Sequence, residues 1–273
     1  MVLLIACVSL ECGPGTKDVD GSCVPTADAG SGVEDSTPTD SATDSTADSG
    51  GETATETDSA TETPPVEPLQ VYILAGQSNM DGYGYYTGLA PSQLVADPRV
   101  PLYWSGWGEF RDLQAASYGG SVYVGPEVTF GRALADADVP VVLVKHAVGG
   151  TDLAAYWYPG STPDAPDAGL GFSVLVDTME AAALELDAAG EPWEWAGFLW
   201  MQGESDALDA RMARAYEENL VGLISAVRTV ADTPDLPALI GLIARESIWT
   251  YADTVRAAQQ AVADADAAVV TVE

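Results

Sequence analysis

The chain of 273 residues is long enough for one sizeable domain with an appendage and too short for two large domains joined by linkers. Its net charge of −32, with only ten Lys and Arg, argues against a nucleic-acid partner, because phosphate backbones are bound through clustered basic side chains. Residues 1–68 hold 14 Asp and Glu and one Lys, so −13 of this charge lies there and −19 on the residues that follow. A net charge of −19 on the folded part disfavours anionic substrates.

The first 26 residues begin with a short apolar run that ends at Cys7. The order Leu-Ile-Ala-Cys resembles a bacterial lipobox, in which the Cys is lipidated and becomes the first residue of the mature protein. No Lys or Arg precedes the run, which is too short for a signal-peptide core, so we interpret the start as truncated or mis-assigned. The competing interpretation is a plain apolar N-terminus. We expect membrane attachment through lipidated Cys7, with the protein lipid-anchored or secreted at the bacterial cell surface or in the periplasm.

Cys12 and Cys23 flank residues 13–22, a loop that a disulfide would close in an oxidising compartment. A zinc site is the weaker interpretation, because two Cys with no nearby His cannot complete a tetrahedral ligand set. Residues 27–68 are rich in Ser, Thr, Asp and Glu. Such a composition buries too little apolar surface to fold, so it predicts a disordered stalk that like charges keep extended.

From residue 69 onward, apolar strand patterns alternate with helical patterns. Strands are predicted at residues 71–74, 139–147, 195–201, 238–244 and 268–272. Helices are predicted at residues 127–137, 173–189, 211–231 and 250–263. This alternation predicts an α/β fold, a parallel sheet covered by helices on both faces.

Gly-rich and polar clusters follow three of these strands, at residues 76–79, 149–151 and 202–206. In open parallel sheets, ligands bind beyond the carboxyl ends of the strands. We therefore expect the three clusters to meet at one edge of the sheet and to form a site there.

Four ordered sequence blocks carry a specific resemblance. They are Ala-Gly-Gln-Ser-Asn-Met at 75–80, Gly-Pro-Glu at 125–127, Val-Gly-Gly-Thr at 148–151 with Trp157 after it, and Trp-Met-Gln-Gly-Glu-Ser-Asp at 200–206. Together they resemble the sialate O-acetylesterase-like carbohydrate esterases of the SGNH hydrolase superfamily, over most of the chain from residue 71. The resemblance implies a three-layer α/β/α, flavodoxin-like domain at 69–273. It also implies hydrolysis of O-acetyl esters of sugars or polysaccharide, such as acetylxylan or sialate-like esters, without metal or cofactor.

The resemblance implies that Ser78 is the nucleophile and that the oxyanion is received by the Gly150 backbone N–H and the Gln202 side-chain amide. A Ser between a strand and a helix is lifted to the sheet edge, where backbone N–H groups are available. Taken alone, Ser78 also suits a turn or helix cap, and the Gly pair a tight turn. Further residues expected to contact substrate are Gln77, Asn79, Gly149, Glu204, Trp157 and His146.

Two acids in the third cluster admit another interpretation. Glu204 and Asp206 would suit a glycosidase pair, but no second acid cluster supports it. We expect them instead to support the site loop by hydrogen bonds, or to be solvated at the start of the next helix. Glu127, directly after a Pro, suits the first turn of a helix as well as it suits a site.

The general base is the missing part of the constellation. The family takes it from an Asp-x-x-His block after the last strand, and this sequence contains no such block. We expect that the last segment, which would carry this block, is lacking. The single histidine, His146, is a substitute base or substrate contact in one interpretation and a packed side chain in another. The alternative function is a carbohydrate-binding surface lipoprotein with a degenerate site, which Trp104, Trp107 and Trp157 would also suit.

Overall fold

The computed structural model describes residues 16–19, 22–25, 67–115, 123–161 and 166–273, in two units, Met1–Thr61 and Glu62–Glu273. In the first unit, β1 (Thr16–Val19) pairs antiparallel with β2 (Ser22–Pro25), with Asp18 opposite Cys23. Cys7, Cys12 and residues 27–66 of the predicted stalk lie outside the described residues, so lipidation and the disulfide stay predictions. Within the described part of the chain, no helix has the length and apolarity needed to cross a bilayer.

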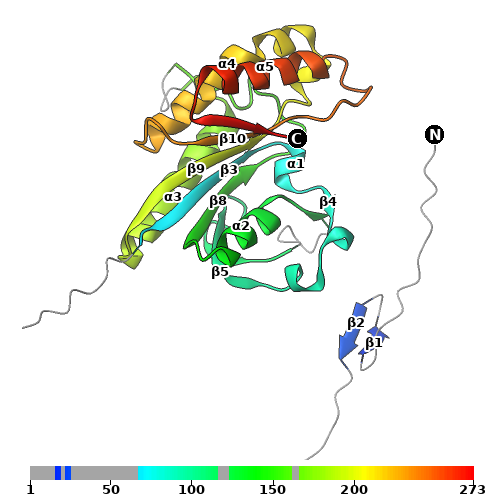
Figure 1. Cartoon of the computed structure of the whole chain (residues 1–273), viewed down its shortest axis with the longest axis vertical. Helices are drawn as coiled ribbons and strands as arrows, with labels where there is room; N and C mark the ends of the chain where they lie inside the picture. The colour runs from blue at the N-terminus through cyan, green and yellow to red at the C-terminus, as the bar shows by residue number, and fades with distance from the viewer. Residues whose placement is uncertain (1–15, 20–21, 26–66, 116–122, 162–165) are drawn as a thin grey trace, which may run out of the picture. The chain divides into compact units, whose positions relative to one another are not determined.

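The second unit is built on a seven-stranded sheet (Figure 1). Its strands are β3 (Leu69–Gly76), β5 (Asp97–Trp104), β6 (Phe110–Leu113), β8 (Val141–Ala147), β9 (Trp193–Met201), β10 (Ala238–Gly241) and β11 (Val269–Val272). Their order is β11-β10-β9-β3-β8-β5-β6, and every neighbouring pair is parallel except β5 and β6. The five predicted strands occupy the order 2-1-3-4-5, which confirms the α/β, flavodoxin-like prediction.

Helices cover both faces of this sheet. One face carries α1 (Ser78–Asp81) and α2 (Glu127–Asp136). The other carries α3 (Leu170–Ala189), α4 (Ala210–Val230) and α5 (Ala252–Ala265). Strand β8 shows why apolar residues are continuous along a strand of this sheet rather than alternating with polar ones. Val142 and Val144 pack toward α3, while Val141 and Leu143 pack toward α2.

Some elements differ from the predicted ones. Strand β10 ends at Gly241 rather than at 244. The hairpin of β5 and β6 was not predicted, because Pro98 and Pro101 interrupt the strand pattern and fit only an edge or a bulge, and the β5–β6 register shifts between Asp97 and Pro101. Short elements complete the unit: β4 (Gly84–Tyr85) paired with β7 (Tyr123–Val124), and the 3-10 helices η1 (Tyr86–Gly88), η2 (Pro91–Gln93) and η3 (Asp206–Leu208).

Candidate active site

Ser78 stands at the carboxyl edge of the sheet, between the end of β3 and the start of α1. The chain turns sharply there at Gly76, whose φ is +146° and whose added Cβ would lie 2.1 Å from the Met201 carbonyl oxygen. Only glycine fits that close approach to β9. Ser78 is half-buried, and as the first residue of α1 its N–H has no helical acceptor.

The glycine pair after β8 lies directly beside Ser78. A Cβ on Gly149 would be 3.7 Å from the Ser78 Cβ and 3.3 Å from the Tyr83 hydroxyl. Gly150 is exposed, has a φ of +75°, and has open space where its Cβ would be. The structure therefore brings Ser78, Gly149 and Gly150 together, as expected from strand ends at one edge.

Gln202 reaches the same edge, but its side chain is fully buried. Its Nε2 donates to the Thr151 carbonyl at 2.9 Å and to Asp206 Oδ2 at 2.6 Å, and Gln77 Oε1 is 3.2 Å away. The Tyr216 hydroxyl donates to the Gln202 carbonyl at 2.7 Å. Because its amide is directed at protein acceptors, Gln202 does not present an N–H to an oxyanion in this geometry, which differs from the role expected for it.

The acids of the third cluster are buried rather than solvated. Asn79 Nδ2 donates to Glu204 Oε1 at 2.7 Å, and Asp206 Oδ2 accepts the Leu153 N–H at 2.9 Å. Burial raises the pKa of both the Glu204 and the Asp206 carboxyl. These contacts, with the Ser205 N–H donating to Gln77 Oε1 at 3.3 Å, tie the loops after β3, β8 and β9 together.

Trp157 and His146 are interior side chains. Trp157 has no exposed surface, and its Nε1 donates to the Thr151 hydroxyl at 2.8 Å, so it packs under the glycine loop instead of facing a substrate. His146 lies 5.3 Å from Trp157 between ring centroids, and its Nδ1 is 2.8 Å from the Ser105 hydroxyl. Burial lowers the pKa of His146 to about 4, so it is neutral at pH 7. Among the described residues, no hydrogen bond joins His146 to Ser78.

A buried ion pair beneath the site was not predicted. Lys145 Nζ lies 2.8 Å from Glu127 Oε2 and donates to the Asp81 carbonyl at 3.0 Å, and each charged side chain is about 5% exposed. Glu127 also accepts the Gly125 N–H at 3.2 Å. Glu127, which suited either a helix start or a site, thus begins α2 and joins it to β8 and α1. The available signal was a Lys within the apolar run of residues 141–147.

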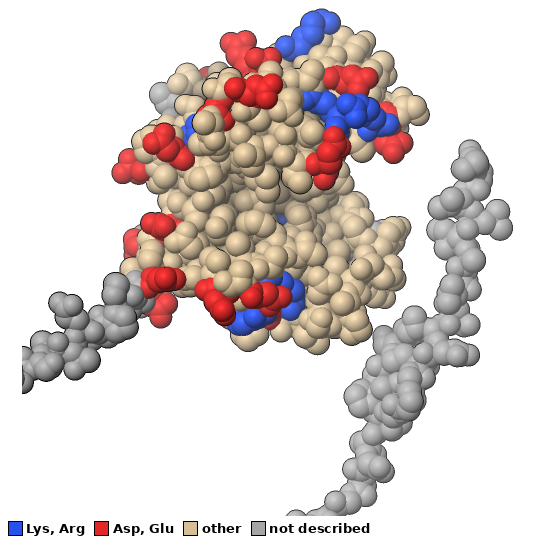
Figure 2. Space-filling view, viewed as in Figure 1, with Lys and Arg blue, Asp and Glu red and all other residues tan. Residues whose placement is uncertain are grey.

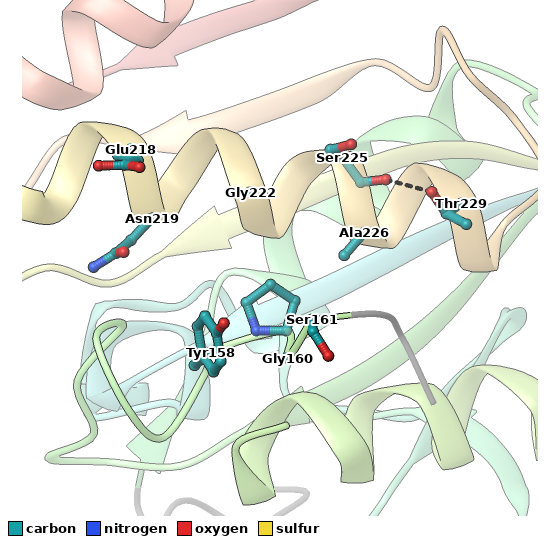
Figure 3. A pocket seen from close by; sticks show the side chains of 10 residues that line it. Tyr158, Gly160, Ser161, Glu218, Asn219, Gly222, Ser225, Ala226 and Thr229 are labelled. Atoms are coloured by element: carbon teal, nitrogen blue, oxygen red, sulfur yellow. Dashed lines mark hydrogen bonds between the residues drawn. The ribbon is translucent and has the colours of Figure 1, made fainter. Parts of the chain in front are cut away.

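Two hollows on the second unit lie apart from Ser78. One, of about 380 Å³, separates the loop at Tyr158–Ser161 from α4, where the Thr229 hydroxyl donates to the Ser225 carbonyl at 2.9 Å (Figure 3). Another, of about 320 Å³, is an apolar groove over β9, β10 and β11. None of the predicted site residues lines either hollow, so neither competes with the Ser78 edge as the site.

Comparison with known proteins identifies the class. Residues 68–273 match the family described as carbohydrate esterase, sialic acid-specific acetylesterase. The chain belongs to this family of carbohydrate esterases.

Individual relatives fit that class. A probable carbohydrate esterase of Arabidopsis thaliana is 31% identical over 217 residues, covering 71% of this chain and 76% of that protein. The crystal structure of an A. thaliana protein superposes with a TM-score of 0.60 at 26% identity over 76% of this chain and 85% of that chain. NanS gives 0.54 at 16% identity over 76% and 78%, and a carbohydrate acetylesterase from Xanthomonas citri gives 0.55 at 18% identity over 74% and 49%. The last two likenesses concern the fold alone.

Proposed function

We propose that this carbohydrate esterase is a serine acetylesterase, which hydrolyses O-acetyl esters of sugars or polysaccharide through Ser78. The observation that carries the proposal is the approach of the Gly149-Gly150 loop to Ser78, with 3.7 Å between the Ser78 Cβ and the position of a Cβ on Gly149. A nucleophile beside exposed backbone N–H groups is the arrangement that acyl transfer requires. The family that residues 68–273 match is described as a sialic acid-specific acetylesterase, which supports the acetyl ester as substrate.

The chemistry follows from that arrangement. Ser78 Oγ attacks the acetyl carbonyl carbon as its proton passes to a base, and the carbonyl oxygen gains negative charge. The backbone N–H groups of Ser78 and Gly150 receive that charge. The sugar oxygen then leaves with a proton, and water hydrolyses the acetyl-Ser78 ester. Gln202 acts as a positioning residue, because it fixes the Thr151 carbonyl and thereby the glycine loop.

The proton acceptor is the part that the described residues do not supply. His146 is hydrogen-bonded to Ser105 and held neutral in the interior, at the end of β8. A positioned base contributes about 10²–10⁴-fold to such a reaction. Exogenous imidazole can replace part of that contribution if Ser78 and its N–H donors are otherwise in place.

The experiment measures acetate release from acetylated xylan by the chain with and without added imidazole. We expect imidazole to raise the rate in proportion to its concentration, and an organophosphonate to label Ser78. Ser78→Ala should abolish both effects, whereas the matched Ser205→Ala variant, changed in the neighbouring third cluster, should keep them. Imidazole-dependent release that persists in Ser78→Ala would contradict the nucleophile assignment.

The second candidate function is carbohydrate binding without hydrolysis, favoured by the absence of a base hydrogen-bonded to Ser78 among the described residues. Acetylated xylan that binds equally to the wild-type and Ser78→Ala chains, with no acetate released even in imidazole, would establish it. In either case we propose a surface or periplasmic location with attachment through Cys7, which the described residues do not include.

A further inference from the structure

A third hollow, of about 510 Å³, lies at the carboxyl ends of β5 and β8. Its volume is in the range of sites for small ligands. Helix α1, the turn after β5 and the end of β8 form its walls. The lining residues are Asp81, Trp104, Ser105, Gly106, Trp107, His146, Ala147 and Val148.

This hollow adjoins the proposed nucleophile from two directions. Asp81 and Ser78 are three residues apart in α1, so their side chains share a helix face about 4.5 Å apart along the axis. Val148, on the opposite wall, directly precedes Gly149, which approaches Ser78. Ser78 is not itself a lining residue, but a molecule that fills the hollow lies against the two walls, at Asp81 and Val148, that adjoin Ser78 and Gly149.

The turn after β5 is built to hold two indole rings. The N–H groups of Trp107 and Gly108 both donate to the Trp104 carbonyl, at 2.8 and 3.1 Å, and Gly108 has a φ of +67°. Gly106 passes so close to Trp104 that a Cβ there would be 3.0 Å from its ring. The two rings lie 5.3 Å apart at 87°, and the Arg111 guanidinium sits 4.8 Å from the Trp107 centroid. The indoles are thus fixed at the rim before any ligand arrives.

The electrostatics of the hollow are those of one carboxylate. Of the described lining residues, Asp81 is the only acid, none is Lys or Arg, and His146 is neutral at pH 7. Arg111, which lies against Trp107, is already paired with Glu109 at 2.6 Å. Asp81 Oδ1 is buried without a hydrogen-bond partner among the described residues. Burial raises the pKa of Asp81, and Lys145, the cation that acts against this shift, is already paired with Glu127. An unsatisfied buried acceptor costs about 1–3 kcal/mol, so a donor supplied by a ligand would be stabilising.

We propose that this hollow is the subsite for the sugar ring that carries the acetyl ester, and that it selects neutral sugars over sugars bearing a carboxylate. The inference rests on the proposed function. A neutral pyranose has C–H faces that pack on indole rings and hydroxyl groups that donate to Asp81. A sialic or uronic acid would instead place its carboxylate near Asp81 with no unpaired cation in the lining, which is unfavourable. Substrates in the class of acetylated xylosides are therefore favoured over acetylated sialates.

The test is equilibrium binding by calorimetry to the full chain carrying Ser78→Ala, which prevents turnover. The two ligands, each with its acetyl ester on the sugar ring, are a methyl O-acetyl-β-xyloside and the methyl glycoside of 4-O-acetyl-N-acetylneuraminic acid. We expect the xyloside to bind at least about tenfold more tightly, since a like-charge contact between the sialate carboxylate and Asp81 costs at least that factor. Adding Trp107→Ala or Asp81→Asn should weaken xyloside binding about tenfold, and Asp81→Asn should also narrow the preference over the sialate.

Trp195→Ala, at the amino end of β9, is the matched control and should leave binding unchanged. Thermal unfolding of each variant verifies the fold. Equal affinity for the two sugars, no xyloside binding, or unchanged binding in the folded Trp107→Ala and Asp81→Asn chains would overturn the subsite. Failure of the esterase assignment would give a different result. The xyloside would bind as expected, but the chain with Ser78 intact would release no acetate even with added imidazole.

Discussion

At the scale of single residues, burial decides what the polar side chains of this site can do. Glu204, Asp206, Gln202 and His146 all lie at the carboxyl edge of the sheet, yet each is at most 5% exposed and held by neighbours. The sequence indicated that these residue types gather there. It could not indicate that the Gln202 amide points inward, because that direction depends on Thr151, which is 51 positions away in the sequence and meets Gln202 only in the folded loops.

His146 provides a prediction about pH. Its pKa of about 4 in the folded chain is below the ordinary value of 6.5, so the unfolded chain binds a proton more readily. Burial of the neutral imidazole therefore does not lower the free energy of unfolding above pH 6.5. As pH falls from 6.5 to about 4, it lowers that free energy progressively, by up to about 3 kcal/mol.

In His146→Asn, which keeps a group able to bond Ser105, this loss should vanish. The free energy of unfolding, from urea titrations between pH 8 and pH 4, should thus fall more steeply for the wild-type chain than for the variant. The comparison between the two proteins cancels the opposite contributions of Asp81, Glu204 and Asp206, whose pKa values are raised by burial. Parallel curves for the two proteins would contradict the buried neutral histidine.

At the scale of elements, the sequence predicted what depends on local pattern. The five apolar runs predicted as strands became β3, β8, β9, β10 and β11, and the four stretches predicted as helices became α2, α3, α4 and α5, with ends displaced by a few residues. The β5–β6 hairpin was not predicted. Strand β5 is stabilised by pairing with β8 over Leu102–Trp104, a tertiary contact that the local sequence pattern of β5 does not indicate. That hairpin carries the two Trp of the proposed sugar subsite.

The Lys145–Glu127 pair joins β8 to α2 and provides the prediction at this scale. Lys145→Met should destabilise the chain by about 3–5 kcal/mol, because it leaves a buried carboxylate without its cation. Lys145→Met combined with Glu127→Leu should recover most of that loss, since the pair is then replaced by apolar contacts of similar volume. The measurement is the urea midpoint of the wild type, both single variants and the double variant.

The exposed pair of Arg245 and Asp253 is the matched control. Arg245→Met should change stability by less than about 1 kcal/mol, because surface ion pairs contribute little. If Lys145→Met were equally mild, the charge of Glu127 would have to be relieved in some other way, and the buried pair would not be a structural link between β8 and α2.

At the scale of the whole molecule, acidic charge is the dominant property. The residues beyond 68 carry 28 Asp and Glu against nine Lys and Arg, and Figure 2 shows red side chains spread around the visible face with few blue ones. Helix α3 is an extreme case, with exposed Asp177, Glu180 and Glu185 and no Lys or Arg along its length. Like charges at this density repel and destabilise the compact state.

Salt should therefore stabilise this protein. The screening length falls from about 30 Å at 0.01 M to about 8 Å at 0.15 M, so repulsion between separated acids is largely removed over that range. A relief of about 1–2 kcal/mol would raise the melting temperature by several degrees for a unit of this size. Glu180→Lys should raise the melting temperature at 0.01 M salt and reduce its salt dependence, because it places a cation between the acids of α3.

A chain that begins at Glu62 tests whether the effect belongs to the folded unit. It should show nearly the same salt dependence as the full chain, because the −13 of residues 1–68 lies mostly outside the second unit. The neutral variant Glu180→Gln separates charge from side-chain size and should shift the melting temperature about half as far as Glu180→Lys. A melting temperature that falls as salt is added would mean that attractive ion pairs outweigh the acidic excess.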